Sequence, residues 1–310
     1  MFGIDQLPSL LLGAGLDPLG HVLDKDVIGS GATALTMNTI TLFIATGVFL
    51  VWMNYVASAI ATGPESEGNE RYITKGRFAQ IIEVIVLYLR DNMIQPHLGE
   101  QTNRFLPFLL TLFFFILTCN LIGLVPLIDI QYVLFGYGNK VVGGTPTGRL
   151  AVTAALALIA FVVWQINGIR SNGISGWLAH FTAGAPWYIW PLIIPVEIVG
   201  MIVKPAALTI RLFANMTAGH VLLAAIVGFT GLAIGGLGWL AGGPIAVVAF
   251  VGGVAIMFLE IFVACLQAFI FMFLTTMFIA QMAHHDHDEH HHEEEDADQP
   301  LANATAVGAA

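Results

Sequence analysis

Long continuous apolar runs alternate with short polar or glycine-rich segments along most of the chain. Several runs approach or exceed the ~20 residues that an α-helix needs to cross the hydrocarbon core of a bilayer. They are not the ~10-residue segments of alternating polarity that are typical of a membrane β-barrel. The pattern therefore predicts an all-α polytopic membrane protein with about five membrane-crossing helices plus one interfacial helix.

The boundaries of these elements follow from where the apolar runs begin and end. The 76–98 segment is the predicted interfacial helix, because apolar side chains recur there at helical spacing among charged and amide side chains. Residues 1–34 are expected to form an external segment, and residues 283–310 a disordered, His- and acid-rich cytoplasmic tail. The crossing helices of the 35–282 membrane domain are predicted at 35–60, 104–127, 150–168, 188–228 and 244–282.

The last two crossing segments, 188–228 and 244–282, are unusually long. At 1.5 Å per residue a helix of ~40 residues is about 60 Å long, roughly twice the thickness of the hydrocarbon core. A tilt of about 20° does not absorb that excess. Either each segment is two helices, or both are steeply tilted and form a hairpin about their glycine-rich connection. The absence of strong helix breakers inside 206–228 and 245–282 favours the hairpin.

Charge distribution sets the expected orientation. The basic residues between the first and second crossings predict that this connection is cytoplasmic. Five crossings then place the N-terminus outside and the C-terminus in the cytoplasm. The residues that carry the prediction are Arg71, Lys75, Arg77, Arg90 and Arg104.

Composition agrees with a membrane location, since only 10% of the residues are charged, against about 25% in ordinary globular domains. Most of the net charge of −10 belongs to the tail and describes little else. The tail's imidazoles and carboxylates are potential metal ligands, but nothing fixes their geometry, so the prediction is a solvated tail without a metal site. Cys119 and Cys265 fall inside predicted membrane helices and are interpreted as small apolar residues.

Charged residues within the fourth crossing segment need an explanation. A charge near the centre of a bilayer costs at least ~2.5–3.5 kcal/mol, and arginine does not avoid this cost by losing its proton. Glu197, Lys204 and Arg211 recur every seven residues and therefore lie on one stripe of the helix. Asn215 lies one turn beyond Arg211, whereas His220 is half a rotation away.

The fifth crossing segment carries a second polar pair, Glu260 and Gln267, which also share a helix face. A hairpin would bring 211–220 and 260–267 to similar depths and allow contacts between the helices. Glutamate and histidine exchange protons with water, while amides donate and accept hydrogen bonds, so the set is typical of a proton path. The alternative is that these groups only join helices through hydrogen bonds, as polar residues in membranes often do.

No GxxxxGK[ST] phosphate-binding loop occurs in the chain, so we do not expect it to bind ATP. The chain is also predicted to have no catalytic residue, no cofactor and no nucleic-acid partner. A lone proton-coupled transporter would be an alternative, but repeated halves and broken helices are absent from the pattern. A purely structural scaffold is the other alternative, and the cost of burying Arg211 disfavours it.

Three stretches carry a resemblance to a known family: KPAALTIRLFANMTAGHV at 204–221, LEIFVACLQAFIFMFLTTMFI at 259–279, and FFFILTCNLIGLVP at 113–126. They resemble subunit a of the F-type ATP synthases. The resemblance implies that Arg211 is the stator arginine that faces the carboxylates of a rotating c-ring. It implies that Asn215 and Gln267 lie along the proton path.

The same resemblance implies that His220 and Glu260 are a proton-exchanging pair in the outer half-channel. Some bacterial members carry the acid at the first position and the histidine at the second. The expected location is a bacterial cell inner membrane. The exchange seen here is similar to the mitochondrial-type arrangement, so a mitochondrial inner membrane is the alternative. Glu197 matches an acid near the inner half-channel, and Lys204 matches a supporting position.

Asn120 also matches the family as a supporting residue, but the acid that some members carry three residues later is Gly123 here. The implied partners are the c-ring, b-type peripheral-stalk subunits, the lipid bilayer and, indirectly, the F1 sector. Protons would pass through two half-channels to and from the c-ring carboxylates and so couple proton flow to rotation and ATP synthesis.

Overall fold

The computed structural model describes residues 26–28, 35–60, 74, 76–125, 127, 143–182 and 186–283. Most of the predicted external segment and the His-rich tail beyond residue 283 therefore lie outside the described residues. Two short strands, β1 (Asp26–Ile28) and β2 (Leu35–Thr36), pair antiparallel just before the first helix, α2 (Met37–Ile60). Except for these strands and short connections, the described chain is helical.

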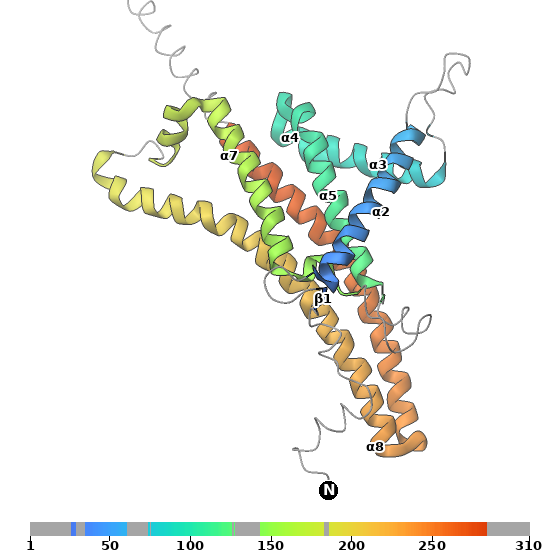
Figure 1. Ribbon diagram of the computed structural model, residues 1–310. Helices are drawn as coiled ribbons and strands as arrows, with labels where there is room; N and C mark the ends of the chain where they lie inside the picture. Colours follow the sequence, from blue (N-terminus) through green and yellow to red (C-terminus); the bar gives the residue numbers. More distant parts are fainter. Residues whose placement is uncertain are drawn as a thin grey trace, which may run out of the picture.

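The segment predicted to be interfacial is helix α3 (Arg77–Leu89), which is followed by the π-helical turn η3 (Arg90–Ile94) and helix α4 (Gln95–Leu98). In Figure 1, α3 crosses α2 instead of running along it. The chain then turns through η4 (Gly99–Gln101), where Gly99 has a positive φ of 50°, into the crossing helix α5 (Thr102–Leu124).

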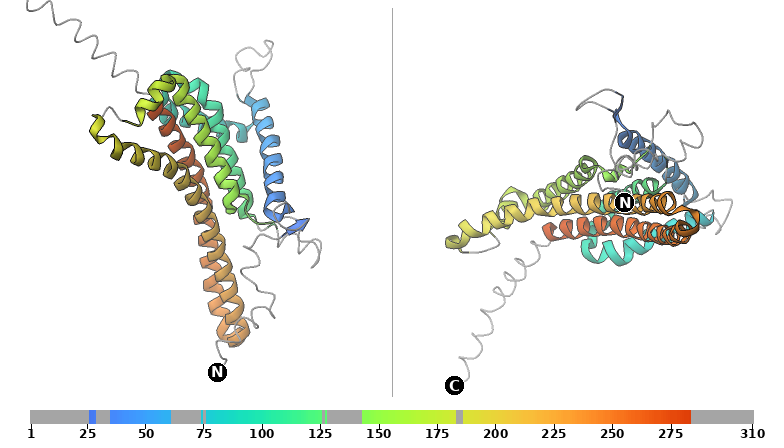
Figure 2. Two further views of the ribbon diagram at one scale, coloured as in Figure 1. Left: turned by 60° about the vertical axis from the view of Figure 1, so that its left-hand side comes forward. Right: turned by 90° about the horizontal axis from the view of Figure 1, so that it is seen from below.

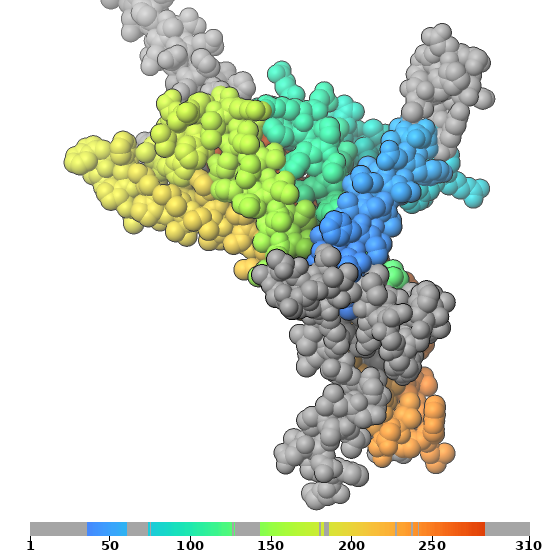
Figure 3. All heavy atoms as spheres, viewed as in Figure 1, coloured from blue at the N-terminus to red at the C-terminus, as the bar shows by residue number. Residues whose placement is uncertain are grey.

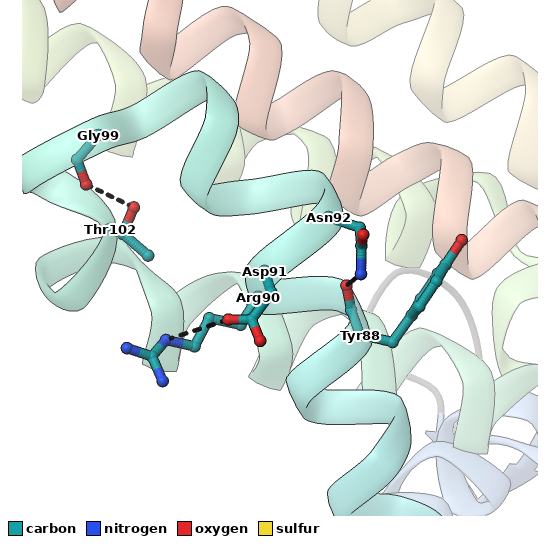
Figure 4. Close-up of polar contacts among 6 residues, drawn as sticks. All are labelled: Tyr88, Arg90, Asp91, Asn92, Gly99 and Thr102. Atoms are coloured by element: carbon teal, nitrogen blue, oxygen red, sulfur yellow. Dashed lines mark hydrogen bonds and ion pairs between the residues drawn. The ribbon is translucent and has the colours of Figure 1, made fainter.

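Local hydrogen bonds hold this turn together, as Figure 4 shows. The Thr102 hydroxyl donates to the carbonyl oxygen of Gly99 at 2.7 Å, and the Asn92 amide donates to the carbonyl oxygen of Tyr88 at 3.2 Å. The ion pair between Arg90 and Asp91 is long, at 3.9 Å between Nε and Oδ1, and exposed. The threonine bond therefore fixes the reversal into α5, and the ion pair adds little.

Helix α7 (Leu150–His180) begins after a short 3₁₀ turn, η5 (Pro146–Gly148). It extends beyond the predicted end at 168: its first helical part continues to Asn172. The direction changes at Gly173, where φ is 68° and ψ is 176°, a conformation that glycine adopts without a Cβ clash.

The last element is a continuous hairpin labelled α8 (Trp190–Ala283), preceded by the 3₁₀ turn η6 (Trp187–Ile189). Its helices meet at Gly238, where φ is 69°, and we call residues 190–237 the first arm and residues 239–283 the second arm. Figures 1 and 2 show the two arms lying side by side and antiparallel over much of their length. The predicted hairpin is confirmed.

Five helical stretches are long and apolar enough to cross a membrane, which confirms the expected all-α polytopic fold among the described residues. Large apolar side chains cover much of the outer surface, as lipid contact requires. Figure 3 shows that the turn of the hairpin, in orange, extends past the other coloured helices. The five stretches are Met37–Ile60, Arg77–Leu124, Leu150–Ala179, Trp187–Gly236 and Gly242–Met282.

The core lies where α5 and α7 pack against the second arm. Buried positions on that arm recur every three or four residues from Ala264 to Ile279, so one stripe of the helix faces inward. The Trp164 ring of α7 contacts Phe278 of the arm at 4.6 Å between ring centroids. This packing fixes the depth and rotation of the second arm, and with it the positions of Glu260 and Gln267.

Candidate functional site

Arg211 lies on the first arm with its side chain exposed at the protein surface. Within the part of the chain that the structure describes, no hydrogen bond or ion pair to Arg211 is present. Its neighbours Leu208 and Leu212 are buried, at 1% and 0% exposure, so the arm packs by one face and presents Arg211 on another. An exposed cation on a membrane helix suits a contact with a group outside this chain.

Asn215 and Gln267 join the two arms. The Asn215 Nδ2 donates to Gln267 Oε1 at 2.9 Å, which is the kind of contact between arms that the hairpin predicts. Gln267 is 2% exposed, and its Nε2 has no hydrogen-bond partner among the described residues. Asn215 is exposed, so the pair reaches from the surface near Arg211 into the interior.

Glu260 is buried against the first arm, with 8% of its surface exposed. Gly219 makes the approach possible, because a Cβ at that position would overlap the Glu260 carboxyl group. The Glu260 Oε1 atom has no partner among the described residues. Glu260 also lines a small hollow between α5 and both arms, together with Leu124, Asn215, Met216 and Val263.

His220 lies next to Gly219 and forms a hydrogen bond through Nε2 with the Thr145 hydroxyl. Thr145 belongs to the 143–149 segment, which is part of the glycine- and proline-rich connection between α5 and α7. The structure brings this segment into the site, and its residues Thr145 and Thr147 are 4% and 0% exposed. The sequence of this Gly- and Pro-rich connection shows no periodic pattern of apolar residues, so the burial of its two threonines could not be predicted from it.

Asn120 ties α5 to the same region. It accepts a hydrogen bond from the Thr147 hydroxyl at 2.7 Å and donates to the carbonyl oxygen of Ala264 at 3.3 Å. Its side chain is fully buried, so both bonds form away from water. We call these groups from α5, the 143–149 segment and the two arms the threonine cluster, which consists of Asn120, Thr145, Thr147, His220 and Glu260.

The 143–149 segment also forms hydrogen bonds with residues of β2 and α2. The Thr41 hydroxyl of α2 donates to the carbonyl oxygen of Gly143 at 2.9 Å and lies 3.1 Å from the Gly143 nitrogen. The Arg149 guanidinium donates to the hydroxyls of Thr36 and Thr39 at 2.9 and 2.7 Å. The segment is therefore fixed to the bundle independently of Thr145.

Glu197 and Lys204 lie in a separate place, nearer the beginning of the first arm. Both line a hollow with Trp164, and Lys204 Nζ donates to Gln281 Oε1 at 3.4 Å. The Lys204 ammonium also lies 5.2 Å from the centre of the Phe278 ring. We call Glu197, Lys204 and Gln281 the lysine cluster. Arg211, which lies seven residues beyond Lys204 on the same arm, is not among the residues that line this hollow.

The groups of the two clusters are a histidine, two carboxylates, a lysine ammonium, amides and hydroxyls. Such groups can bind water, and the histidine and the carboxylates can exchange protons. No group of three or more His, Cys, Asp or Glu residues that could hold a metal ion occurs in the described ranges.

Comparisons with known proteins identify a family. The model of the family described as ATP synthase A chain matches residues 39–280. ATP synthase subunit a of Chloroherpeton thalassium is 38% identical over 288 residues, which are 92% of this chain and 78% of that protein. The subunit a of Myxococcus xanthus is 42% identical over 225 residues, 70% of this chain and 66% of that protein. The subunit a of Chlorobium phaeobacteroides strain BS1 is 35% identical over 272 residues, which are 87% of this chain and 72% of that protein.

Proposed function

The chain belongs to the ATP synthase A chain family, and from this premise we propose that it is the proton-channel stator subunit of an F-type ATP synthase. It is a non-catalytic membrane subunit, and the chemistry of ATP takes place elsewhere in the complex. Its contribution is to conduct protons and so couple their flow to rotation.

The proposed path consists of two half-channels that meet at Arg211. The threonine cluster, with His220 and Glu260, forms the outer half-channel, and the lysine cluster, with Glu197, forms the inner one. The lysine cluster lines one hollow that borders the hairpin, and Glu260 of the threonine cluster lines the other. Along the helix axis Lys204 and Asn215 are separated by about 16 Å, so the two hollows are offset in depth.

A proton entering past His220 and Glu260 neutralises a carboxylate on a ring of partner subunits, which can then face lipid. When that carboxylate approaches Arg211 again, the fixed positive charge favours its ionised form, and the proton leaves past Glu197. The membrane potential contributes about 2.3 kcal/mol per charge for each 100 mV. Asn215 and Gln267 keep the arms in register beside the arginine.

One observation carries this proposal: Arg211 is an exposed cation on a membrane hairpin, without a partner in the described chain, and its arm borders two hollows that are each lined by a carboxylate, Glu197 in one and Glu260 in the other. A c-ring carboxylate supplies the missing partner. Proposed further contacts are b-type peripheral-stalk subunits, the lipid bilayer and, indirectly, the F1 sector. We place the protein in a bacterial cell inner membrane, with its N-terminus outside and its C-terminus in the cytoplasm.

Replacing Arg211 tests the proposal. Arg211→Ala should abolish proton-driven ATP synthesis in membrane vesicles, because no fixed charge would favour release of the ring's proton, while the complex still assembles. Ile210→Ala is the matched control, since Ile210 is a neighbouring exposed side chain at 59% exposure. Near-normal synthesis by an assembled Arg211→Ala complex would contradict the proposed role and favour a scaffold.

A further inference from the structure

We propose that Thr145 is a positioning residue for His220, an inference that rests on the proposed function. The Thr145 hydroxyl bonds to Nε2 of the imidazole ring, and the threonine itself is buried. A hydrogen bond to one ring nitrogen determines which tautomer the ring adopts and where the other nitrogen points. Thr145 thereby sets the orientation in which His220 exchanges protons with water and with Glu260.

Gly123 of α5 makes this contact possible. A Cβ at position 123 would overlap the Thr145 side chain at three of its atoms, although Gly123 itself is in ordinary helix. The absence of a side chain on α5 therefore leaves the space that Thr145 occupies against His220. A larger side chain at position 123 would therefore displace the Thr145 side chain.

The backbone that carries Thr145 is fixed by other bonds. The Gly143 backbone accepts a hydrogen bond from the Thr41 hydroxyl through its carbonyl oxygen and donates one to it through its nitrogen. The Thr147 hydroxyl donates to the side-chain oxygen of Asn120. The carbonyl oxygen of Thr145 accepts a hydrogen bond from the Gly148 nitrogen at 2.9 Å. Removing only the Thr145 hydroxyl therefore leaves the segment in place and frees the histidine ring.

The titratable or charged groups on the elements that pack around His220 come from three segments and its own arm. They are Glu260 and Cys265 on the second arm, Arg104 and Cys119 on α5, Arg149 after η5, and Glu197, Lys204 and Arg211 on the arm that carries His220. Arg149 is engaged with Thr36 and Thr39. A change in the pH profile on altering Thr145 thus reports on the exchange between His220, Glu260 and water.

The test measures ATP-driven proton pumping by the complete complex in vesicles over a range of pH. Thr145→Val should lower pumping about three- to ten-fold, the effect expected for loss of one hydrogen bond, and should change the pH of half-maximal pumping. Thr145→Ser keeps the hydroxyl and should restore both. Gly123→Ala should reproduce the valine phenotype while Thr145 is unchanged.

Two controls separate the possible outcomes. Thr153→Val removes a fully buried hydroxyl that donates to the carbonyl oxygen of Leu150 and has no other hydrogen bond among the described residues, and it should leave pumping and its pH profile unchanged. His220→Ala tests the path itself. Normal pumping by His220→Ala would contradict the proposed outer half-channel.

If His220→Ala impairs proton pumping while Thr145→Val pumps normally, only the positioning role of Thr145 is overturned. Equal impairment of the serine and valine variants would also overturn it, since a purely structural requirement would then explain both. If Thr145→Val does not assemble, Gly123→Ala decides the matter by its pumping rate and pH profile.

Discussion

The threonine cluster and the lysine cluster lie on the same hairpin but are built differently. The threonine cluster draws on α5, the 143–149 segment and both arms, and its side chains are mostly buried. The lysine cluster is a looser contact in which Lys204 is half-buried and Gln281 is exposed. A buried site depends on an accurate fit of several segments, whereas an open one tolerates change because water can replace a lost partner.

The largest expected difference between the clusters concerns their carboxylates. Glu260→Gln should reduce proton pumping by at least about ten-fold, because an amide cannot bind and release the proton. Glu197→Gln should have the smaller effect, since Glu197 is only half-buried. Pumping by assembled complexes measures both. Equal losses for the two variants would contradict the distinction between a closed and an open cluster.

An intermediate effect is expected when the fit of the threonine cluster is disturbed without removing a polar group. Gly219→Ala introduces a Cβ that would overlap the Glu260 carboxyl, so the carboxyl group must shift, and pumping should fall about two- to five-fold. Gly200→Ala on the same arm is the control, because a Cβ there meets nothing within 4 Å. A harmless Gly219→Ala would show that the position of Glu260 is not critical.

The smallest effect is expected for Lys204→Met. The variant removes the 3.4 Å contact with Gln281 and the cation–π contact with Phe278, which together are worth about 1 kcal/mol or less at a partly exposed site. Thermal unfolding of the purified complex should therefore shift by only a few degrees, with Lys204→Arg closer to the original. A large loss of stability would show that the lysine cluster is structurally as demanding as the threonine cluster.

The helices and the hairpin could be predicted because their signal is local. Continuous apolar runs define membrane helices, and a run of ~40 residues without a breaker has few alternatives to a long hairpin arm. The depth of Asn215 relative to Gln267 followed from the hairpin alone, and the structure shows them bonded. The roles assigned to the polar residues remain predictions until the variants are measured.

The burial of Thr145 and Thr147 could not be predicted in the same way. Where a connection between helices lies is decided by the surfaces that meet it, here Asn120 and Gly123 on α5 and Thr41 on α2. These contacts join residues far apart in sequence and leave no periodic pattern. Gly123 and Gly219 could be interpreted as packing positions, but the sequence does not reveal that one faces a threonine and the other a carboxylate.

The overlap between position 123 and the Thr145 side chain has a consequence for protein engineering. A chimera that takes α5 from a relative with a larger residue at this position, but keeps the 143–149 segment, would force two side chains into the space of one. Transplanting the helix together with the segment avoids the conflict. The unit of exchange between such proteins is therefore the helix with its following connection, and not the transmembrane helix alone.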